Sequence, residues 1–279
     1  MDNKKVWFIT GASKGLGLSL ARQVLQQGNF VAATSRTIDA LQTAIGKAND
    51  RFLPLQVDLN NEDSVAKALE QTHQTFGQID VVVNNAGYGI GGSIEELTDK
   101  ETRDSFDINV FGTLNVIRKV LPFLRDQKSG HILNISSIAG ISANTGWSIY
   151  AATKYAIVGL SEVLAEDVRS LGIRVTVVAP GAFRTSFLSS ESLVMTQNPI
   201  AIYEEVRASH AKYLKLDGHQ AGDPEKAAEA MIQITEESNP PLYLLLGSDA
   251  YQRAFNKLAS MTKEFQSWES LTKSTDFKN

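Results

Sequence analysis

A tyrosine and a lysine stand four residues apart in the run YAATK at residues 150–154. If this run is helical, the two side chains share a face, and the ammonium of Lys154 lies near the phenol of Tyr150. A phenol has a pKa of about 10 and is a poor acid or base at neutral pH, whereas a neighbouring ammonium favours the phenolate and lowers that pKa. The pair is therefore a candidate for acid/base chemistry. The spacing alone is weak, because Tyr203 and Arg207 repeat it with a guanidinium.

The position of Ser137 supports a functional role for this pair, which the spacing alone does not establish. It follows the apolar run Ile132–Ser136, which reads as a buried strand, and Gly140 opens the turn beyond. A hydroxyl at the carboxyl end of a parallel strand lies on the ligand-binding edge of the sheet. There it can hold a substrate oxygen through a hydrogen bond that strengthens as charge develops. Ser137, Tyr150 and Lys154 thus predict reduction of a carbonyl, or oxidation of an alcohol, with Tyr150 as the acid/base.

A glycine-rich loop, TGASKGLG at residues 10–17, follows the first apolar run. Glycines let the backbone turn sharply and approach a pyrophosphate, whose charge then rests on the N-terminus of the next helix. The spacing G-x-x-x-G-x-G differs from the standard dinucleotide fingerprint, so the position after a strand carries the inference. The cofactor contacts expected in this loop are Gly11, Ser13, Lys14, Gly15, Leu16 and Gly17.

The end of the second apolar run distinguishes the two nicotinamide cofactors. An NAD enzyme has an acid there that holds both ribose hydroxyls, but this chain has Ser35 and Arg36. Arg36 can form paired hydrogen bonds with a 2′-phosphate, Ser35 can donate to it, and Lys14 adds charge. The alternative is that both cations are ordinary surface residues; the pattern favours NADP(H). Asp58 and Leu59 follow the third run, where a carboxylate can accept from an adenine amino group or simply end a strand.

The elements that must position these residues repeat as a short apolar run followed by a longer helical pattern. Unbroken apolar runs are typical of parallel strands covered on both faces. The alternation predicts an α/β fold: a doubly wound, Rossmann-like parallel sheet of about seven strands, in a single domain over residues 1–279. The predicted strands are Val6–Thr10, Phe30–Thr34, Phe52–Val57, Val81–Asn84, Ile132–Ser136, Val175–Ala179 and Leu242–Leu246.

Several helix boundaries carry recognisable signals. Gly28 is placed to end the first helix, and Asn60 to cap the helix after the third strand. The run TDKE at residues 98–101 is a capping box that opens a helical segment to about Arg125. The pair Asp223-Pro224 puts a capping acid before a proline at the first helical position.

Two segments do not follow the alternation. Residues 186–222 are long and aperiodic, which is typical of a functional loop, so we expect a substrate lid there. Residues 248–279 read as a charged amphipathic C-terminal helical tail. Apolar residues that can line a pocket under the lid, or form its own packing core, are Phe183, Phe187, Leu188, Leu193 and Met195.

The composition excludes other classes of function. A net charge of −4 offers no basic field for nucleic acid or anionic lipid, and no apolar stretch approaches the ~20 residues of a membrane span. The absence of cysteine removes thiolate catalysis and disulfides. No secretory segment is visible, so we expect a cytoplasmic protein. No metal is expected, because the four histidines show no metal-ligand spacing. Surface or loop positions are predicted for all of them, His73, His131, His210 and His219.

Together these motifs resemble the short-chain dehydrogenase/reductase family over residues 6 to about 246. The resemblance rests on the glycine loop, on NNAG at residues 84–87, on the serine, tyrosine and lysine, and on Pro-Gly after the sixth strand. It implies that Tyr150 donates or accepts the proton, that Lys154 binds the nicotinamide ribose and lowers the phenol pKa, and that Ser137 positions the carbonyl.

The same resemblance assigns residues that the spacing does not. It implies that Asn109 anchors a water relay to Lys154 and that Thr185 contacts the nicotinamide carboxamide. The basic residues at positions 14 and 36 are similar to those of NADP-preferring members. The further cofactor contacts that it implies are Asn85, Ala86, Gly87, Tyr150, Lys154, Pro180, Gly181, Phe183 and Thr185.

The sequence names a reaction class but no single carbonyl or alcohol substrate. The alternatives within the enzyme class are reduction of a 3-oxoacyl thioester and oxidation of a steroid- or retinol-like alcohol. A non-catalytic protein that senses NADP(H) is the alternative from another class, but such a protein needs none of the serine–tyrosine–lysine set.

The helix that carries Tyr150 continues through AIVGLSEVLA at residues 156–165 and is apolar around most of its circumference. This surplus predicts a homodimer, the arrangement common in the family that the chain resembles. The tail after Ser248 could instead cover that face within one chain. Small residues occur on this helix at Ala152, Ala156 and Gly159, and the helix of Asn109 has a similar apolar excess in Val110, Phe111, Leu114, Val116 and Ile117.

Overall fold

The computed structural model describes residues 4–277, and within that range seven parallel strands form one sheet in the order β3-β2-β1-β4-β6-β7-β9. The strand order reverses between β1 and β4, where a doubly wound sheet opens the crevice for its ligand. Every predicted strand of the sheet is present, with ends shifted by at most two residues. The strands are β1 (Val6–Ile9), β2 (Phe30–Ser35), β3 (Phe52–Gln56), β4 (Val81–Asn84), β6 (Gly130–Ile135), β7 (Ile173–Pro180) and β9 (Tyr243–Leu246).

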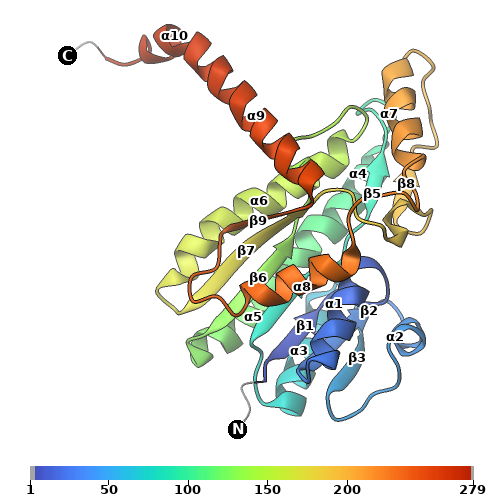
Figure 1. Cartoon of the computed structure of the whole chain (residues 1–279), viewed down its shortest axis with the longest axis vertical. Helices are drawn as coiled ribbons and strands as arrows, with labels where there is room; N and C mark the ends of the chain where they lie inside the picture. Colours follow the sequence, from blue (N-terminus) through green and yellow to red (C-terminus); the bar gives the residue numbers. More distant parts are fainter. Residues whose placement is uncertain (1–3, 278–279) are drawn as a thin grey trace.

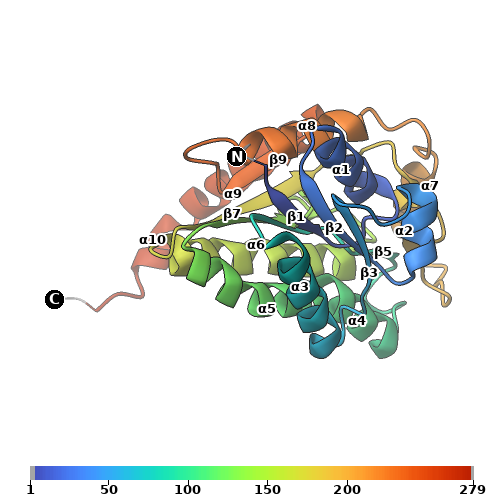
Figure 2. The same cartoon turned by 90° about the horizontal axis from the view of Figure 1, so that it is seen from below.

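Helices cover both faces of the sheet (Figure 2). One face packs against α1 (Gly15–Gln26) and α8 (Pro224–Ile234), and the other packs against α3 (Glu62–Phe76), α5 (Gly112–Gln127) and α6 (Ser148–Arg169). Because side chains alternate along a strand, Trp7 and Phe8 of β1 enter opposite cores, and both are fully buried. The remaining helices are α2 (Ile38–Ala44), α4 (Asp99–Phe106), α7 (Glu204–Leu214), α9 (Ser248–Ser267) and α10 (Glu269–Lys273).

Most of the predicted helix boundaries are confirmed, and one is wrong by a residue. Gly28 follows the end of α1, the capping box at residues 98–101 begins α4, and Pro224 is the first residue of α8, as expected. Asn61, not Asn60, caps α3, because its Oδ1 accepts from the N–H groups of Asp63 and Ser64. The N–H of Asn60 instead donates to the Asp58 carboxylate at 3.0 Å, in the turn before the helix.

Two features have no counterpart in the sequence analysis. A small parallel sheet pairs β5 (Gly89–Gly91) with β8 (Leu193–Met195), so the start of the 186–222 segment is fastened beside the main sheet. The helical segment expected to run to about Arg125 is interrupted by a π-helical turn, Asp107–Phe111, between α4 and α5. π-turns of this kind occur frequently at functional sites.

The tail is helical, as predicted, but α9 projects away from the body of the domain (Figure 1). Its first turns pack Ala250 and Ala254 against Ile138. Farther along, Phe265 and Trp268 are 65% and 60% exposed. Residues 278–279 of the tail lie outside the described residues. Among residues 4–277, no helix combines the length and apolar character needed to cross a membrane.

Candidate active site

Tyr150 lies in the first turn of α6, and Lys154 follows one turn later on the same face. Lys154 is buried, with 6% of its surface exposed, and its Nζ donates to the carbonyl oxygen of Ile135 at 2.9 Å. The same Nζ lies 5.8 Å from the centre of the Tyr150 ring. Because Ile135 ends β6, these contacts bring the tyrosine and lysine to the carboxyl edge of the sheet, where the spacing predicted them.

The ionisation of the pair differs from the expectation. Burial raises the pKa of Tyr150 to about 12, although a side-chain hydrogen bond with Ser137 acts in the opposite direction. Burial also lowers the pKa of Lys154 to about 8. The expected lowering of the phenol pKa by the ammonium is not found, because loss of hydration around the buried phenol has the largest effect and raises the pKa. The phenol is therefore protonated at neutral pH.

Ser137 follows β6 and begins a 3-10 helix, Ile138–Gly140, in which its Oγ accepts from the N–H of Ala139 at 3.1 Å. This turn lies directly against α6. A Cβ on Gly140 would stand 2.6 Å from the carbonyl oxygen of Lys154, so only glycine permits this approach. The close packing explains how Ser137 comes within hydrogen-bonding reach of Tyr150.

Asn109 lies in the π-turn and is 1% exposed. Its Oδ1 accepts from the N–H of Tyr88 at 3.0 Å, and its Nδ2 donates to the carbonyl of Tyr88 at 3.0 Å and to Thr153 Oγ1 at 3.1 Å. A Cβ on Gly87 would meet Asn109 Oδ1 at 2.9 Å and Lys154 Nζ at 3.6 Å. The structure therefore brings together the asparagine, the NNAG run and the lysine that the resemblance assigned.

The glycine loop is held by the segment after β4. Asn85 Nδ2 donates to the carbonyl oxygens of Thr10 and Gly11 at 2.9 and 3.0 Å. Gly11 has φ +64°, and a Cβ there would lie 2.8 Å from the Cα of Ala86. A Cβ on Gly17 would lie 2.4 Å from Asn85 Nδ2. The G-x-x-x-G-x-G spacing thus has a structural reason, since these glycines make room for the asparagine and its neighbour.

Gly15 and Thr185 face each other across the loop. Gly15 has φ +60°, and the nearest atom to a Cβ there is Thr185 Cβ at 3.8 Å. Thr185 Oγ1 accepts from the N–H of Phe187 at 3.3 Å and so starts a short 3-10 turn. Leu16 packs against the core beneath the loop. The threonine implied to contact the carboxamide therefore lies beside the predicted pyrophosphate loop.

The residues predicted for the adenosine end lie at the ends of β2 and β3. Ser35 Oγ donates to Ser13 Oγ at 3.4 Å, and Arg36 is exposed next to them. Lys14, expected to face a phosphate, forms an ion pair with Glu191 at 3.3 Å. Both side chains of this pair are partly or largely exposed, so it contributes little to stability.

Asp58 is exposed at the end of β3. Its carboxylate accepts from the N–H of Asn60, a structural contact of the ordinary strand-end kind. The carbonyl oxygen of Leu59 accepts from Asn115 Nδ2 at 2.8 Å, which ties this turn to α5. Both residues border the same edge of the sheet as Ser35.

Asp249, which sequence reasoning missed, holds the Pro180-Gly181 turn. Its carboxylate accepts from the N–H of Ala182 at 2.9 Å, and a Cβ on Gly181 would stand 2.1 Å from its Oδ1. The glycine is therefore required by the first turn of α9. Phe183 packs against the core and forms a backbone bridge with Gly222, so it closes the base of the 186–222 segment.

Two of the four histidine predictions are wrong. His131 and His210 are 4% and 5% exposed, in β6 and α7. The strand begins before the apolar run that marked it, so His131 is a buried strand residue. Its Nε2 lies 2.9 Å from Thr176 Oγ1, and because that hydroxyl donates to the carbonyl of Pro241, the proton lies on Nε2. His219 is exposed, and His73 is half-buried on α3.

An open pocket of about 600 Å³ lies between the β5–α4 turn, the residues before α6 and the start of α7. Phe187 covers the phenol from the 186–222 segment, with its ring 5.9 Å from that of Tyr150. Leu193 and Met195 pack over the glycines of β5. The lining residues include Ser93, Ile94, Gly146, Ser148, Ile202 and Val206.

Comparison with known proteins identifies the family and several relatives of this chain. The family model described as short chain dehydrogenase matches residues 5–194. The oxidoreductase BOA17 of Botryotinia fuckeliana is 36% identical over 270 residues, which cover 96% of this chain and 98% of the relative. A 3-ketodihydrosphingosine reductase of Bacteroides thetaiotaomicron is 35% identical over 243 residues, which cover 87% and 88% of the two chains.

Solved structures share the fold over most of their length. A short-chain dehydrogenase from Streptomyces avermitilis has a TM-score of 0.91 and 36% identity, covering 99% of this chain and 100% of its own. A 3-ketoacyl-(acyl-carrier-protein) reductase from Brucella melitensis, complexed with NADH, has a TM-score of 0.73 and 25% identity, covering 86% and 96%. A serine dehydrogenase complexed with NADP+ has a TM-score of 0.74 and 27% identity, covering 86% and 94%.

A doubly wound sheet with a glycine loop after its first strand, and with a serine, a tyrosine and a lysine beside β6, defines a class of dinucleotide-dependent oxidoreductases. The chain belongs to the short chain dehydrogenase family of oxidoreductases, whose solved members include complexes with NADH and with NADP.

Proposed function

We propose that this protein is an NADP(H)-dependent oxidoreductase that interconverts a carbonyl and an alcohol, with Tyr150 as the acid/base. The observation that carries the proposal is the meeting of Ser137, Tyr150 and Lys154 at the carboxyl end of β6, with Asn109 beside the lysine. A protein that only sensed the dinucleotide would have no use for this arrangement.

The residues around the crevice fit a dinucleotide. The loop between β1 and α1 has positive φ at Gly11 and Gly15, and a Cβ on Gly15 would lie in ordinary contact with Thr185 Cβ at 3.8 Å. Such a loop can approach a pyrophosphate closely. Asn85, Gly87 and Lys154 would hold the nicotinamide end. When bound, the nicotinamide would supply or accept the hydride.

The choice of NADP(H) rests on this chain's own residues, because solved relatives carry either cofactor. Arg36 is exposed and has no hydrogen bond or ion pair with any residue from 4 to 277, so its guanidinium is available to a 2′-phosphate. Ser35 and Ser13 lie together beside it. No acid stands at the end of β2 to hold a 2′-hydroxyl.

The protonation of the site favours reduction at neutral pH. With a pKa of about 12, Tyr150 is protonated and can donate its proton to a carbonyl oxygen. Ser137 would hydrogen-bond the same oxygen as it gains negative charge. Lys154, with a pKa of about 8, remains mostly charged and stabilises the phenolate that forms.

A 3-keto substrate with a long chain is the second candidate, because two relatives are described as 3-ketodihydrosphingosine and 3-ketoacyl reductases. Oxidation of a steroid- or retinol-like alcohol remains the alternative from the sequence.

NADPH oxidation over a panel of ketones, aldehydes, quinones and 3-oxoacyl thioesters tests the proposal. We expect turnover of at least one carbonyl class, faster with NADPH than with NADH at equal subsaturating concentration. Tight NADPH binding without turnover of any compound would instead support the sensing alternative.

A further inference from the structure

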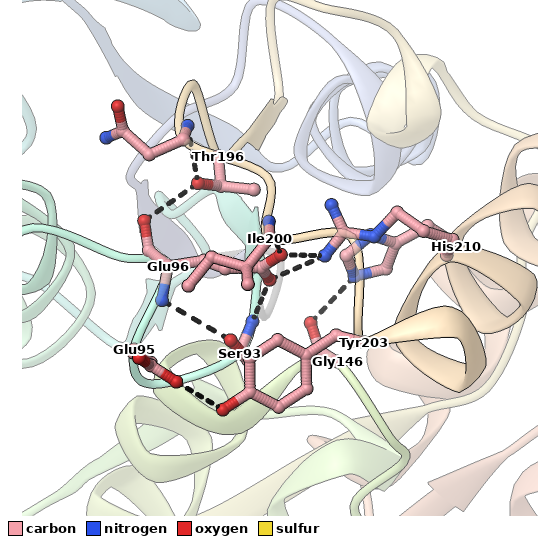
Figure 3. A network of polar contacts seen from close by, with 10 residues as sticks. Ser93, Glu95, Glu96, Gly146, Thr196, Ile200, Tyr203 and His210 are labelled. Atoms are coloured by element: carbon pink, nitrogen blue, oxygen red, sulfur yellow. Dashed lines mark hydrogen bonds and ion pairs between the residues drawn. The ribbon is translucent and has the colours of Figure 1, made fainter.

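Glu96 is a buried carboxylate in the turn between β5 and α4, and its side chain is 0% exposed. Its Oε1 accepts from the N–H of Ile200 at 2.7 Å, and its Oε2 accepts from the N–H of Ser93 at 2.8 Å. Both oxygens also accept from the guanidinium of Arg207 on α7. Figure 3 shows Glu96 with Ser93 and Ile200 beside it. A buried charge is tolerated when it is paired and fully hydrogen-bonded, and this carboxylate meets both conditions.

The carboxylate stays ionised throughout the neutral range. Burial acts to raise the pKa of Glu96, but the hydrogen bonds from Ile200, Ser93 and Arg207 outweigh it and hold the pKa at about 2. The pair with Arg207 therefore stays charged at neutral pH, and because the carboxylate is buried, salt screens this pair less than it screens a surface ion pair.

The same turn holds the 186–222 segment at further points. Thr196 Oγ1 donates to the carbonyl oxygen of Glu96 at 2.8 Å, and the hydroxyl of Tyr203 donates to the Glu95 carboxylate at 2.6 Å (Figure 3). These contacts precede α7, whereas Arg207 lies on it. The turn at residues 93–96 therefore fixes both the entry to α7 and its first part.

The other side of α7 lies on the residues that precede the catalytic helix. His210 Nε2 lies 2.9 Å from the carbonyl oxygen of Gly146, and Asn144 Nδ2 donates to the hydroxyl of Tyr213. Trp147 packs edge-on against the rings of His210 and Tyr213, with centres 5.0 and 5.1 Å apart. Because Trp147 precedes α6, the position of α7 is linked to the start of the helix that carries Tyr150.

We infer that Glu96 is a positioning residue: through Arg207 and Ile200 it fixes α7 over residues 144–147 and so sets the wall of the substrate site, without taking part in the chemistry. This wall borders the open pocket lined by Gly146, Ser148 and Val206, and Ser148 lies two residues before Tyr150 in the first turn of α6. The inference rests on the proposed function, because it assigns the substrate end of the same site.

The Glu96→Gln variant tests this inference, because it keeps the shape of the side chain but removes the charge. Its amide nitrogen would also face N–H donors from Ser93 or Ile200, so α7 should lose its fixed position. With a carbonyl substrate from the panel, we expect KM to rise by about tenfold or more, because a displaced wall weakens binding of the substrate and of the transition state alike. The kcat should therefore change by less than about threefold. The Kd for NADPH should be unchanged, because the hydrogen bonds of the Glu96 carboxylate reach Ser93, Ile200 and Arg207 and not the glycine loop.

Control and companion variants distinguish a positioning role of Glu96 from a general loss of stability. Glu166→Gln removes an exposed carboxylate that pairs with Arg169 on α6, and it should leave KM unchanged. The KM of Arg207→Lys should be closer to the wild-type value than the KM of Arg207→Ala. The double variant Glu96→Gln/Arg207→Ala should be little worse than either single variant, because the two groups act as one unit. An unchanged KM in folded Glu96→Gln, or equal losses of kcat on every substrate together with weaker NADPH binding, would overturn the inference.

Hydrogen exchange tests the inference separately from the proposed function. In Glu96→Gln, amides of residues 196–214 should exchange faster, while those of residues 10–36 should not change. Unaltered exchange over 196–214 contradicts the role of Glu96 even if no carbonyl substrate is found.

Discussion

At the scale of single residues, loss of hydration governs the reacting groups. It places the pKa of Tyr150 at about 12 and that of Lys154 at about 8, so both are protonated at pH 7. Proton donation to a carbonyl then needs no prior ionisation, whereas alcohol oxidation needs the phenolate. Initial rates measured in both directions from pH 6 to 10 should therefore show reduction as the faster reaction at neutral pH and an oxidation rate that increases as the pH rises.

Arg36→Ala should weaken NADPH binding by roughly 1–3 kcal/mol and leave NADH binding unchanged, because only NADPH carries the 2′-phosphate that the guanidinium would bind. Titration of the cofactors against the wild type and the variant measures both affinities. Arg125→Ala, at an exposed arginine near the end of α5, is the control and should bind both cofactors as the wild type does. Equal affinity of the wild type for NADPH and NADH would contradict the cofactor assignment.

His131 should make the protein sensitive to acid. Burial, with smaller effects from Arg174 and Lys5, lowers its pKa from 6.5 to about 3 in the folded state. On acidification His131 is therefore protonated first in the unfolded chain. The contribution of the neutral histidine to the free energy of unfolding is fully present above pH 6.5 and is lost as the pH falls from 6.5 toward 3. Urea unfolding at pH 7 and pH 4.5 should show a smaller loss of unfolding free energy in His131→Gln than in the wild type. If the unfolding free energy of His131→Gln fell by as much as that of the wild type, His131 would not be the source of the acid sensitivity.

The reacting residues could be predicted from the sequence because their spacing is local or follows a strand end. Glu96 and Asp249 could not, since their partners, Arg207 and the N–H of Ala182, lie 111 and 67 residues away. A lone acid in a turn gives no sign of which distant group it meets. His131 was missed for a related reason, because its burial depends on the neighbouring strands.

At the scale of elements, the strands of the main sheet were predictable because burial on both faces demands unbroken apolar runs. The β5–β8 pair was not, because β5 is Gly89-Ile90-Gly91 and has no apolar pattern. Glycine is required there by packing, since a Cβ on Gly89 would lie 2.9 Å from Leu193 Cδ1. The π-turn that holds Asn109 likewise has no sequence signal.

The contacts of α7 indicate that only part of the segment at residues 186–222 can act as a lid. Residues 193–195 are paired with β5 and residues 196–214 are held by the Glu96 turn, so we propose that closure on substrate involves residues 186–191, which carry Phe187 over Tyr150 and Glu191 against Lys14. Saturation with NADPH and substrate should slow hydrogen exchange over 186–191 and leave 196–214 nearly unchanged. Unchanged exchange over 186–191 would count against a lid.

At the scale of the whole molecule, the apolar surplus of α5 and α6 is smaller than the sequence indicated. Val110, Val116 and Ile117 are buried within the chain. Phe111, Tyr155 and Val163 are 52%, 42% and 61% exposed, and a Cβ on Gly159 would meet no atom within 4 Å. α9 projects away from the body instead of lying flat along it (Figure 1). An exposed apolar face of this kind is typical of a protein interface.

We therefore propose a homodimer through α5 and α6. Sedimentation at micromolar concentration should give a species of twice the 30.4 kDa chain, and Val163→Glu should shift it toward the monomer by placing a charge in the contact. Val194→Glu, at an apolar residue that is 38% exposed on β8, is the control and should leave the assembly unchanged. A single 30.4 kDa species that does not change as the concentration rises would contradict the dimer.

The most direct test of the central claim is single-turnover oxidation of NADPH by Tyr150→Phe, with the best substrate of the carbonyl panel. We expect the rate to fall by about 100-fold or more, because the proton donor is lost, while the Kd for NADPH stays within about twofold of the wild type. Tyr155→Phe, at an exposed tyrosine on the same helix, should react at the wild-type rate. If Tyr150→Phe retained more than a few percent of the rate, another group would be the acid, and the account would be wrong.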